Sequence, residues 1–288
     1  MKHIIINADD LGADEARNEG ILEAIRAETV TSVSILANGH ALEDALQRIR
    51  SLGPSRISFG IHCNISEGKP LSTGLRILTG PDGSFLKKAA ALRLLMQDDN
   101  EALEHEIALE LDMQIKILKD AGLHLTHIDG HHHAHVFPAA IEAVCAAAGR
   151  HGIPWVRIPD EPEPIFREDT IADSLIEETG TFSSVARSAR FHLKDTGLRA
   201  ADHFRGLYLK GRISLPLMQR TLEKLPPGLT EIMVHPGRAF TDNLTAGPFS
   251  SFSTVDRERE LDVLLSEEFR LTLSHIGVII IPFPEADG

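Results

Sequence analysis

Apolar residues follow two alternating patterns along the chain. Short runs rich in β-branched residues, such as residues 3–8 and 31–37, predict strands. Each is followed by a segment with apolar residues three or four positions apart, such as residues 15–29, which predicts a helix. The alternation continues: further strands are expected over residues 57–64, 123–126, 155–159, 202–204, 230–235 and 276–281, and further helices over residues 41–52, 86–97, 101–121, 137–148, 182–198, 215–225 and 255–273.

Seven or eight strands separated mostly by helices indicate an α/β protein with a parallel sheet. A TIM-like (β/α) barrel, distorted or incompletely closed, accounts best for this pattern, and a doubly wound sheet is the alternative. No repeat or linker stands out in the sequence, so a single domain over residues 1–288 is expected.

A histidine cluster lies between an expected strand and an expected helix. Residues 127–138 read HIDGHHHAHVFP, with five histidines and one aspartate within nine residues. If the strand continues through this stretch, its two-residue period places His127, Asp129, His131 and His133 on one face. Imidazole and carboxylate groups are ligands of zinc, iron, nickel and manganese. Because the cluster lies mid-chain, unlike a purification tag, it indicates a divalent metal site.

Other polar residues fall where expected strands end. In a parallel barrel these ends share one face, on which catalytic residues gather. The first strand ends in Asp9 and Asp10, the third in His62, and later strands in Arg157 and His235. Any one of them could be a helix cap, a satisfied polar group or a surface ion pair. Together with the histidine cluster they favour a metal-dependent hydrolase.

Asp9 and Asp10 are adjacent, and adjacent side chains on a strand point to opposite faces. Both can reach a metal only if a turn or bulge separates them. A division of labour is therefore expected, in which one carboxylate binds the metal and the other accepts a proton from an activated water. His235 could protonate the leaving group from the far side of the site.

Composition narrows the possible partners and compartment. The formal net charge is −13 and no run of lysine and arginine occurs, which disfavours nucleic acid and anionic membranes. The first apolar run is too short for a signal peptide, and no stretch approaches the roughly 20 apolar residues of a membrane span, so a cytoplasmic protein is expected. Cys63 and Cys145 are the only cysteines and are expected to be free thiols.

Several motifs in one order resemble the YdjC family of carbohydrate deacetylases. They are NADDLG at residues 7–12, GIHCNISEGKPLS at 60–72, HIDGHHHAHVFP at 127–138, VRIP at 156–159, ADHFRG at 201–206 and VHPG at 234–237. The resemblance covers most of the chain. It implies an irregular barrel similar to that of the polysaccharide deacetylases, and removal of acetyl groups from N-acetylated sugars such as diacetylchitobiose or from glycolipids. It also implies a homodimer.

The resemblance implies roles for particular residues. The implied metal ligands are Asp10, His62 and His131, with Asp9 as the general base and His235 as the general acid. Residues expected to contact substrate or to support the ligands are Asn64, Asp129, His133 and Arg157, together with His127, His132 and His135. The family is described with magnesium, whereas two imidazoles and a carboxylate suit zinc or another transition metal better. Asp129 is the best acceptor for the second ring nitrogen of a ligating histidine.

The resulting hypothesis is hydrolysis of an acetamido group to an amine and acetate. The alternatives are a metal-dependent phosphoesterase or sugar isomerase on the same barrel, and a metal-dependent sugar-binding protein without turnover. Few basic residues lie in the motifs, which argues against a phosphate substrate. The loops at residues 66–85, 160–180 and 238–252 are expected to select the sugar.

Overall fold

Eight parallel strands form one sheet within the residues that the computed structural model describes, which are 1–52, 56–97, 100–165, 170–239 and 247–284. The α/β class and the parallel sheet are therefore confirmed. In sequence order the strands are β1 Lys2–Leu11, β2 Ser32–Ile35, β3 Ser58–Cys63, β4 Leu125–Gly130, β5 Trp155–Val156, β6 His203–Arg205, β7 Gly228–Val234 and β8 Ile279–Ile280.

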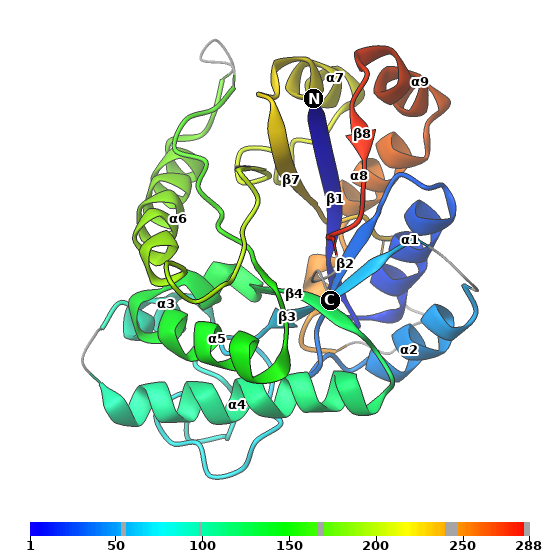
Figure 1. The fold of residues 1–288 in the computed structure, drawn as a ribbon. Helices are drawn as coiled ribbons and strands as arrows, with labels where there is room; N and C mark the ends of the chain where they lie inside the picture. Colours follow the sequence, from blue (N-terminus) through cyan, green and yellow to red (C-terminus); the bar gives the residue numbers. More distant parts are fainter. Residues whose placement is uncertain (53–55, 98–99, 166–169, 240–246, 285–288) are drawn as a thin grey trace.

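Helices surround the strands (Figure 1). They are α1 Glu15–Arg26, α2 Leu42–Arg50, α3 Lys88–Leu95, α4 Glu101–Asp120, α5 Pro138–His151, α6 Asp173–His192, α7 Leu215–Lys224, α8 Val255–Leu265 and α9 Glu267–Ile276, with short 3₁₀ helices η1 His131–Val136 and η2 Ser250–Phe252. Side-chain hydrogen bonds cap the N-terminal ends of α1 and α4. The side chain of Asp14 accepts from Arg17 N at the start of α1, and that of Asn100 accepts from Leu103 N at the start of α4.

The sheet is strongly curled. Its strand order is β5-β4-β3-β2-β1-β7-β6, and β8 adds to β1 at His3 and Ile4. A flat sheet would separate β5 from β1 by four strand spacings, about 19 Å. Yet Arg157, which directly follows β5, donates to Asp9 on β1 at 2.6 Å and to Glu231 on β7 at 2.6 Å. One bridge between Trp155 and Arg199 joins β5 to the segment before β6. The prediction of a distorted, incompletely closed barrel is therefore confirmed.

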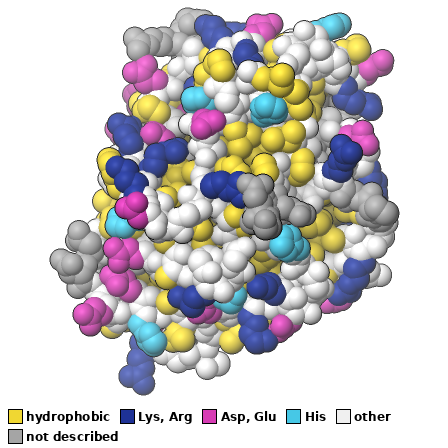
Figure 2. All heavy atoms as spheres, viewed as in Figure 1, with side chains coloured by type: hydrophobic (Ala, Val, Ile, Leu, Met, Phe, Trp, Pro, Cys, Tyr) yellow, Lys and Arg dark blue, Asp and Glu magenta, His cyan; other side chains and the backbone are white. Residues whose placement is uncertain are grey.

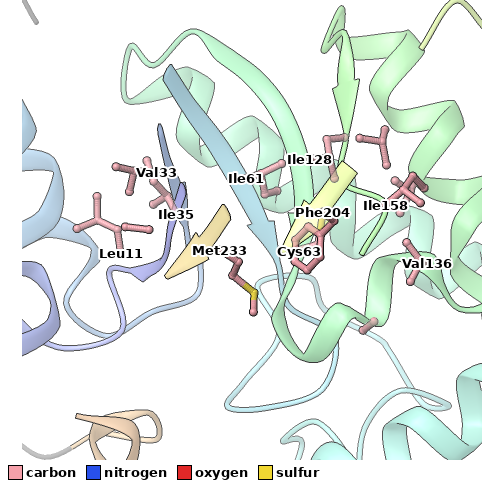
Figure 3. Close-up of a cluster of buried hydrophobic side chains, with 14 of the residues drawn as sticks. Leu11, Val33, Ile35, Ile61, Cys63, Ile128, Val136, Ile158, Phe204 and Met233 are labelled. Carbon is pink, nitrogen blue, oxygen red and sulfur yellow. The ribbon is translucent and has the colours of Figure 1, made fainter. Parts of the chain in front are cut away.

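The two faces of the curled sheet have opposite chemistry. One face is apolar and packs in the main core, where Figure 3 shows Val33, Ile35, Ile61 and Ile128 in one buried cluster. The alternate residues on these strands are small or polar. Ser34 Oγ donates to Asp129 at 2.5 Å across the inner face. The helices thus cover the apolar face, and the interior of the curl is left for polar side chains.

Several predicted elements were wrong in extent. The single helix expected over residues 255–273 is two helices, because Ser266 has extended backbone and caps α9 by accepting from Phe269 N. The last strand, expected to be buried, is limited to β8, where Ile279 is 42% exposed. Helix α6 begins at Asp173, within the region expected to be a loop.

Positive and negative side chains are mixed on the surface (Figure 2). Lys and Arg side chains are interspersed with Asp and Glu on the face shown in Figure 2. No helix among the described residues is long and apolar enough to cross a membrane. Cys63 and Cys145 are both free thiols, as predicted.

Candidate metal and catalytic site

A cavity opens at the carboxyl ends of the strands. Its wall includes residues that end or follow β1, β3, β4 and β7, as the barrel rule predicted. Helix α6 and the segments near η2 complete it. Of the predicted site residues, those that line the cavity are Asp9, Asp10, His62, His131, His132, His133 and His235.

A bulge in β1 brings both adjacent carboxylates to this cavity. The pairing register of β1 with β2 shifts between Ala8 and Leu11, and Asp10 has a φ of 71°. That left-handed backbone is uncommon outside glycine, although aspartate tolerates it better than most residues. A turn or bulge between Asp9 and Asp10 was the condition for both carboxylates to reach one site, and the structure contains this bulge.

Asp10, His62 and His131 form a buried group whose ligand atoms lie within 4.8 Å of one another. Asp10 Oδ1 is 3.2 Å from His62 Nε2 and 3.0 Å from His131 Nδ1. Burial alone would raise the pKa of Asp10, but His131 and His62 outweigh it and hold that pKa well below its ordinary value. This carboxylate is therefore ionised at neutral pH.

His62 has a carboxylate on each ring nitrogen. Nδ1 donates to Asp129 Oδ1 at 2.7 Å, while Nε2 faces Asp10. Burial lowers the pKa of His62, but Asp129 and Asp9 overcome this effect and raise it to about 10. A cation that binds Nε2 must therefore displace a proton.

Two further groups of possible ligands share residues with this one. Asp9, His62 and Asp129 form the first, and Glu67, His131 and His132 form the second. In the first group both carboxylates are already bonded to Arg157, whose Nη2 lies 2.7 Å from Asp9 Oδ1 and 2.7 Å from Asp129 Oδ2. Asp10 has a longer contact with Arg17, at 3.3 Å. The Asp10 group is therefore a better candidate for a cation than the Asp9 group.

Arg157 lies behind the cavity and connects three carboxylates. Its guanidinium holds Asp9 through two hydrogen bonds of 2.6 and 2.7 Å, and also contacts Asp129 and Glu231. Burial disfavours the charged guanidinium, but these carboxylates raise the pKa of Arg157 well above its usual value. The side chain is fully buried and does not line the cavity.

His235 faces Asp9 across the cavity, with Nε2 4.0 Å from Asp9 Oδ2. Its backbone N–H donates to Glu260 at 2.7 Å, which fixes the end of β7 against α8. Burial and the nearby Arg257 hold the pKa of His235 well below its usual value. Burial raises the pKa of Asp9, and Arg157 opposes that rise.

The histidine cluster does not continue as a strand. β4 ends at Gly130, and His132 and His133 have left-handed backbone within η1. The expectation that the two-residue period extends through His131 and His133 is therefore wrong. It holds for His127 and Asp129, which both contact Ser34.

The remaining cluster histidines have separate surroundings. His127 stacks on Phe283, with ring centroids 4.3 Å apart, and burial lowers its pKa to about 3. His135 Nε2 lies 2.9 Å from the carbonyl of Arg157. His132 Nδ1 lies 3.1 Å from Ser66 Oγ. His133 lines the cavity and meets the ring of Phe182 edge-on.

Asn64 lies in the turn after β3 rather than in the cavity wall. Its side chain donates to the carbonyl of Glu67 at 2.8 Å and accepts from the backbone N–H groups of Ser66 and Glu67 at 3.1 Å. Its bonds therefore shape the loop that begins at residue 64.

Sequence reasoning missed several residues around the site. Glu231, which binds Arg157, is a lone acidic residue in an expected strand, and an acidic residue is seldom fully buried unless it is paired. Lys210 and Arg257 line the cavity but come from a loop and a helix whose placement depends on tertiary packing. Leu175, Glu178 and Phe252 line it from two of the three expected specificity loops. Residues 166–169 and 240–246 of those loops lie outside the described residues.

Two imidazoles and a carboxylate at one cavity wall fit a divalent cation. The second nitrogen of His62 already has its acceptor in Asp129, as metal-bound imidazoles usually do. Asp129 is in turn held by Ser34 and Arg157. The orientation of His62 is thus set independently of any bound ion.

Comparison with known proteins identifies relatives along nearly the whole chain. A mouse (Mus musculus) protein named carbohydrate deacetylase is 32% identical over 300 residues, which cover 99% of this chain and 95% of the relative. A chitooligosaccharide deacetylase of Escherichia fergusonii is 31% identical, with 95% of each chain covered. The crystal structure of an Enterococcus faecalis V583 protein named for cellobiose-phosphate cleavage is similar in fold, with a TM-score of 0.72, 23% identity and 98% and 97% coverage.

The model of a protein family described as YdjC-like protein matches residues 3–275, which include every motif noted in the sequence. The chain therefore belongs to the YdjC-like family.

Proposed function

We propose that this protein is a metal-dependent carbohydrate N-deacetylase, which hydrolyses an acetamido group of an N-acetylated sugar to an amine and acetate. The names of the mouse and Escherichia fergusonii relatives support the reaction class. The observation that carries the proposal is the group of Asp10, His62 and His131 in one cavity with Asp9 and His235.

Asp10, His62 and His131 would hold the cation. When bound, a divalent cation would polarise the acetyl carbonyl and lower the pKa of the attacking water. The two imidazoles favour zinc or another transition metal over magnesium on ligand chemistry. Asp129 would keep His62 in the orientation and tautomer that presents Nε2 to the ion.

Asp9 would accept the proton of the attacking water. Burial raises the pKa of this carboxylate, which makes it a stronger base than an exposed aspartate, and Arg157 fixes its orientation through two hydrogen bonds. His235 would protonate the departing nitrogen. Since its pKa is low at rest, His235 would gain its proton during the reaction, from Asp9 at 4.0 Å or through an intervening water.

The wall of the cavity supports a sugar as the substrate. It combines polar groups with the apolar side chains of Leu175, Phe182, Leu207 and Phe252, which is the mixture that an amphipathic sugar ring requires. Lys210 and Arg257 also line it and are the observation that favours the phosphoesterase alternative. We propose that the described parts of the loops at 160–180 and 238–252 select the sugar.

Acetate release tests the proposed reaction. The purified protein would be incubated with N-acetylglucosamine, chitin oligomers and acetylated glycolipids, before and after chelation and readdition of metal. We expect acetate release that stops on chelation and returns with the cation. Release of phosphate without acetate from phosphorylated sugars would instead support the phosphoesterase, and binding of sugar without any product would support the binding protein.

The ligand assignment makes a separate prediction. His131→Ala is expected to weaken cation binding by more than about 100-fold, because it removes one of three direct ligands and loss of an outer hydrogen-bond partner alone costs about 10–100-fold. His133→Ala is the matched control, since His133 lines the same cavity but belongs to none of the possible ligand groups among the described residues. Metal content after dialysis against a defined chelator would be measured. Equal retention by both variants would move the ligand elsewhere in the cluster.

A further inference from the structure

We infer that Glu67 is a positioning residue, which accepts a hydrogen bond from His131 Nε2 and so orients His131 toward the cation. The inference rests on the metal site proposed above. It concerns the loop after β3, whose NISEG stretch at residues 64–68 has no part in the proton transfers.

The two nitrogens of His131 have different surroundings. Nδ1 faces Asp10 at 3.0 Å and is the atom that would reach a cation shared with His62. Nε2 is buried and has no hydrogen-bond partner among the described residues, while the His131 side chain is only 7% exposed. A buried N–H without an acceptor costs about 1–3 kcal/mol, so an acceptor is expected nearby.

Glu67 supplies the nearest carboxylate. Its Oε2 lies 3.7 Å from His131 Nε2, which is within ion-pair distance but longer than a hydrogen bond. The Glu67 side chain is 19% exposed, so its end can move by the small distance needed to reach about 2.8 Å. Phe249 and Phe252 flank the ring of His131 edge-on and limit its rotation.

The other proposed imidazole ligand, His62, already has a carboxylate that accepts from its second ring nitrogen. His62 presents Nε2 to Asp10 and donates Nδ1 to Asp129 at 2.7 Å. Each histidine thus has one nitrogen toward Asp10 and the other toward a carboxylate that is not in the Asp10 group. Such outer carboxylates fix ring orientation and increase ligand basicity.

Glu67 is held in place from helix α4. Gln114 binds both backbone groups of Asn64, accepting from its N–H at 3.0 Å and donating to its carbonyl at 2.7 Å. Asn64 in turn binds the N–H and the carbonyl of Glu67. Gln114 itself donates to Glu110, which also accepts from Leu71 N. The backbone of Glu67 is therefore fixed while its carboxylate remains adjustable.

The test compares the cation affinity of Glu67→Ala, Glu67→Gln and unchanged protein by competition with a chelator, with Co²⁺ as the probe and its absorption spectrum recorded. We expect Glu67→Ala to bind Co²⁺ about 10–100-fold more weakly. Glu67→Gln keeps a neutral acceptor, so it should recover part of this loss. Glu178→Gln is the matched control, because Glu178 lines the same cavity but pairs with Lys88, and its affinity should change less than about 2-fold.

The outcomes separate this inference from the proposed function. Equal Co²⁺ affinity of Glu67→Ala and the unchanged protein would overturn the role of Glu67 and leave the metal site standing. A Co²⁺ spectrum that loses a ligand in both Glu67 variants, with no recovery in Glu67→Gln, would also overturn it and make Glu67 a direct ligand. If the unchanged protein bound no Co²⁺, the metal site itself would fail.

Discussion

Replacing Arg157 with methionine is expected to lower the free energy of unfolding by about 3–5 kcal/mol. Arg157 is fully buried and is bonded to Asp9, Asp129 and Glu231. Methionine fills similar space but leaves these carboxylates without their cation. A buried carboxylate without a compensating cation either stays ionised at a high cost in free energy or takes up a proton.

The loss of unfolding free energy in Arg157→Met should depend on pH in a defined direction. Without Arg157, burial would hold the pKa of Asp9 further above that of the unfolded chain. A raised folded pKa contributes stability that is present at low pH and is lost as the pH rises. Arg157→Met is therefore expected to be less destabilising at pH 5 than at pH 8, as measured by urea unfolding at both pH values.

Glu231→Gln is the control for this prediction. Burial raises the pKa of Glu231 to about 7, so this partner is only partly ionised near neutral pH. Glutamine keeps an oxygen that can accept from Arg157 Nε. Glu231→Gln is therefore expected to lower the free energy of unfolding by less than about 1.5 kcal/mol. Unfolding of Arg157→Met at the same urea concentration as the unchanged protein would show that the guanidinium does not stabilise the carboxylate group.

The strand-end rule explains why much of the site could be predicted from sequence. Asp9, Asp10, His62 and His235 all end or directly follow strands of one parallel sheet, and such ends must share one edge. The rule identifies the edge of the sheet at which the site lies, but not how far from that edge each side chain lies along its strand. His127 lies three residues before the end of β4, so its side chain is buried one layer lower, against Ser34 and Phe283.

Residues outside strands could not be placed in the same way. Glu67 lies near His131 because Asn64 fixes the loop and Gln114 on α4 holds Asn64, and the bond between Gln114 and Asn64 joins residues that are far apart in sequence. Arg257 lines the cavity from α8, a helix whose pattern of apolar and charged residues is like that of any surface helix. No local pattern encodes such placements.

Two errors in the fold have local physical causes. The break between α8 and α9 had a signal that was overlooked, since Ser266 followed by two glutamates is typical of a helix start. The helical spacing of apolar residues continues through both helices, and so it predicted one helix without a break at Ser266. The change from β4 to η1 at Gly130 was harder to foresee, because His132 and His133 adopt left-handed backbone, which is uncommon outside glycine.

Asp9→Asn is expected to lower kcat for acetate release by about 10²–10⁴-fold, which is the usual contribution of one general base. Asparagine has nearly the same shape and keeps an oxygen for Arg157, so folding should be preserved. Bound metal per protein should not change, because Asp9 is outside the group of Asp10, His62 and His131. Acetate release and metal content would be measured on the same preparations.

Asp10→Asn on the same bulge is the matched comparison. It should lose metal as well as activity, because Asp10 is the only carboxylate of the proposed ligand group. If the results were reversed, with metal lost from Asp9→Asn and kept by Asp10→Asn, the cation would lie instead among Asp9, His62 and Asp129. Arg157 would then face a cation across the two carboxylates that it holds, and Asp10 would be the remaining candidate for the base. The two substitutions therefore decide which of two adjacent carboxylates binds the metal and which accepts the proton.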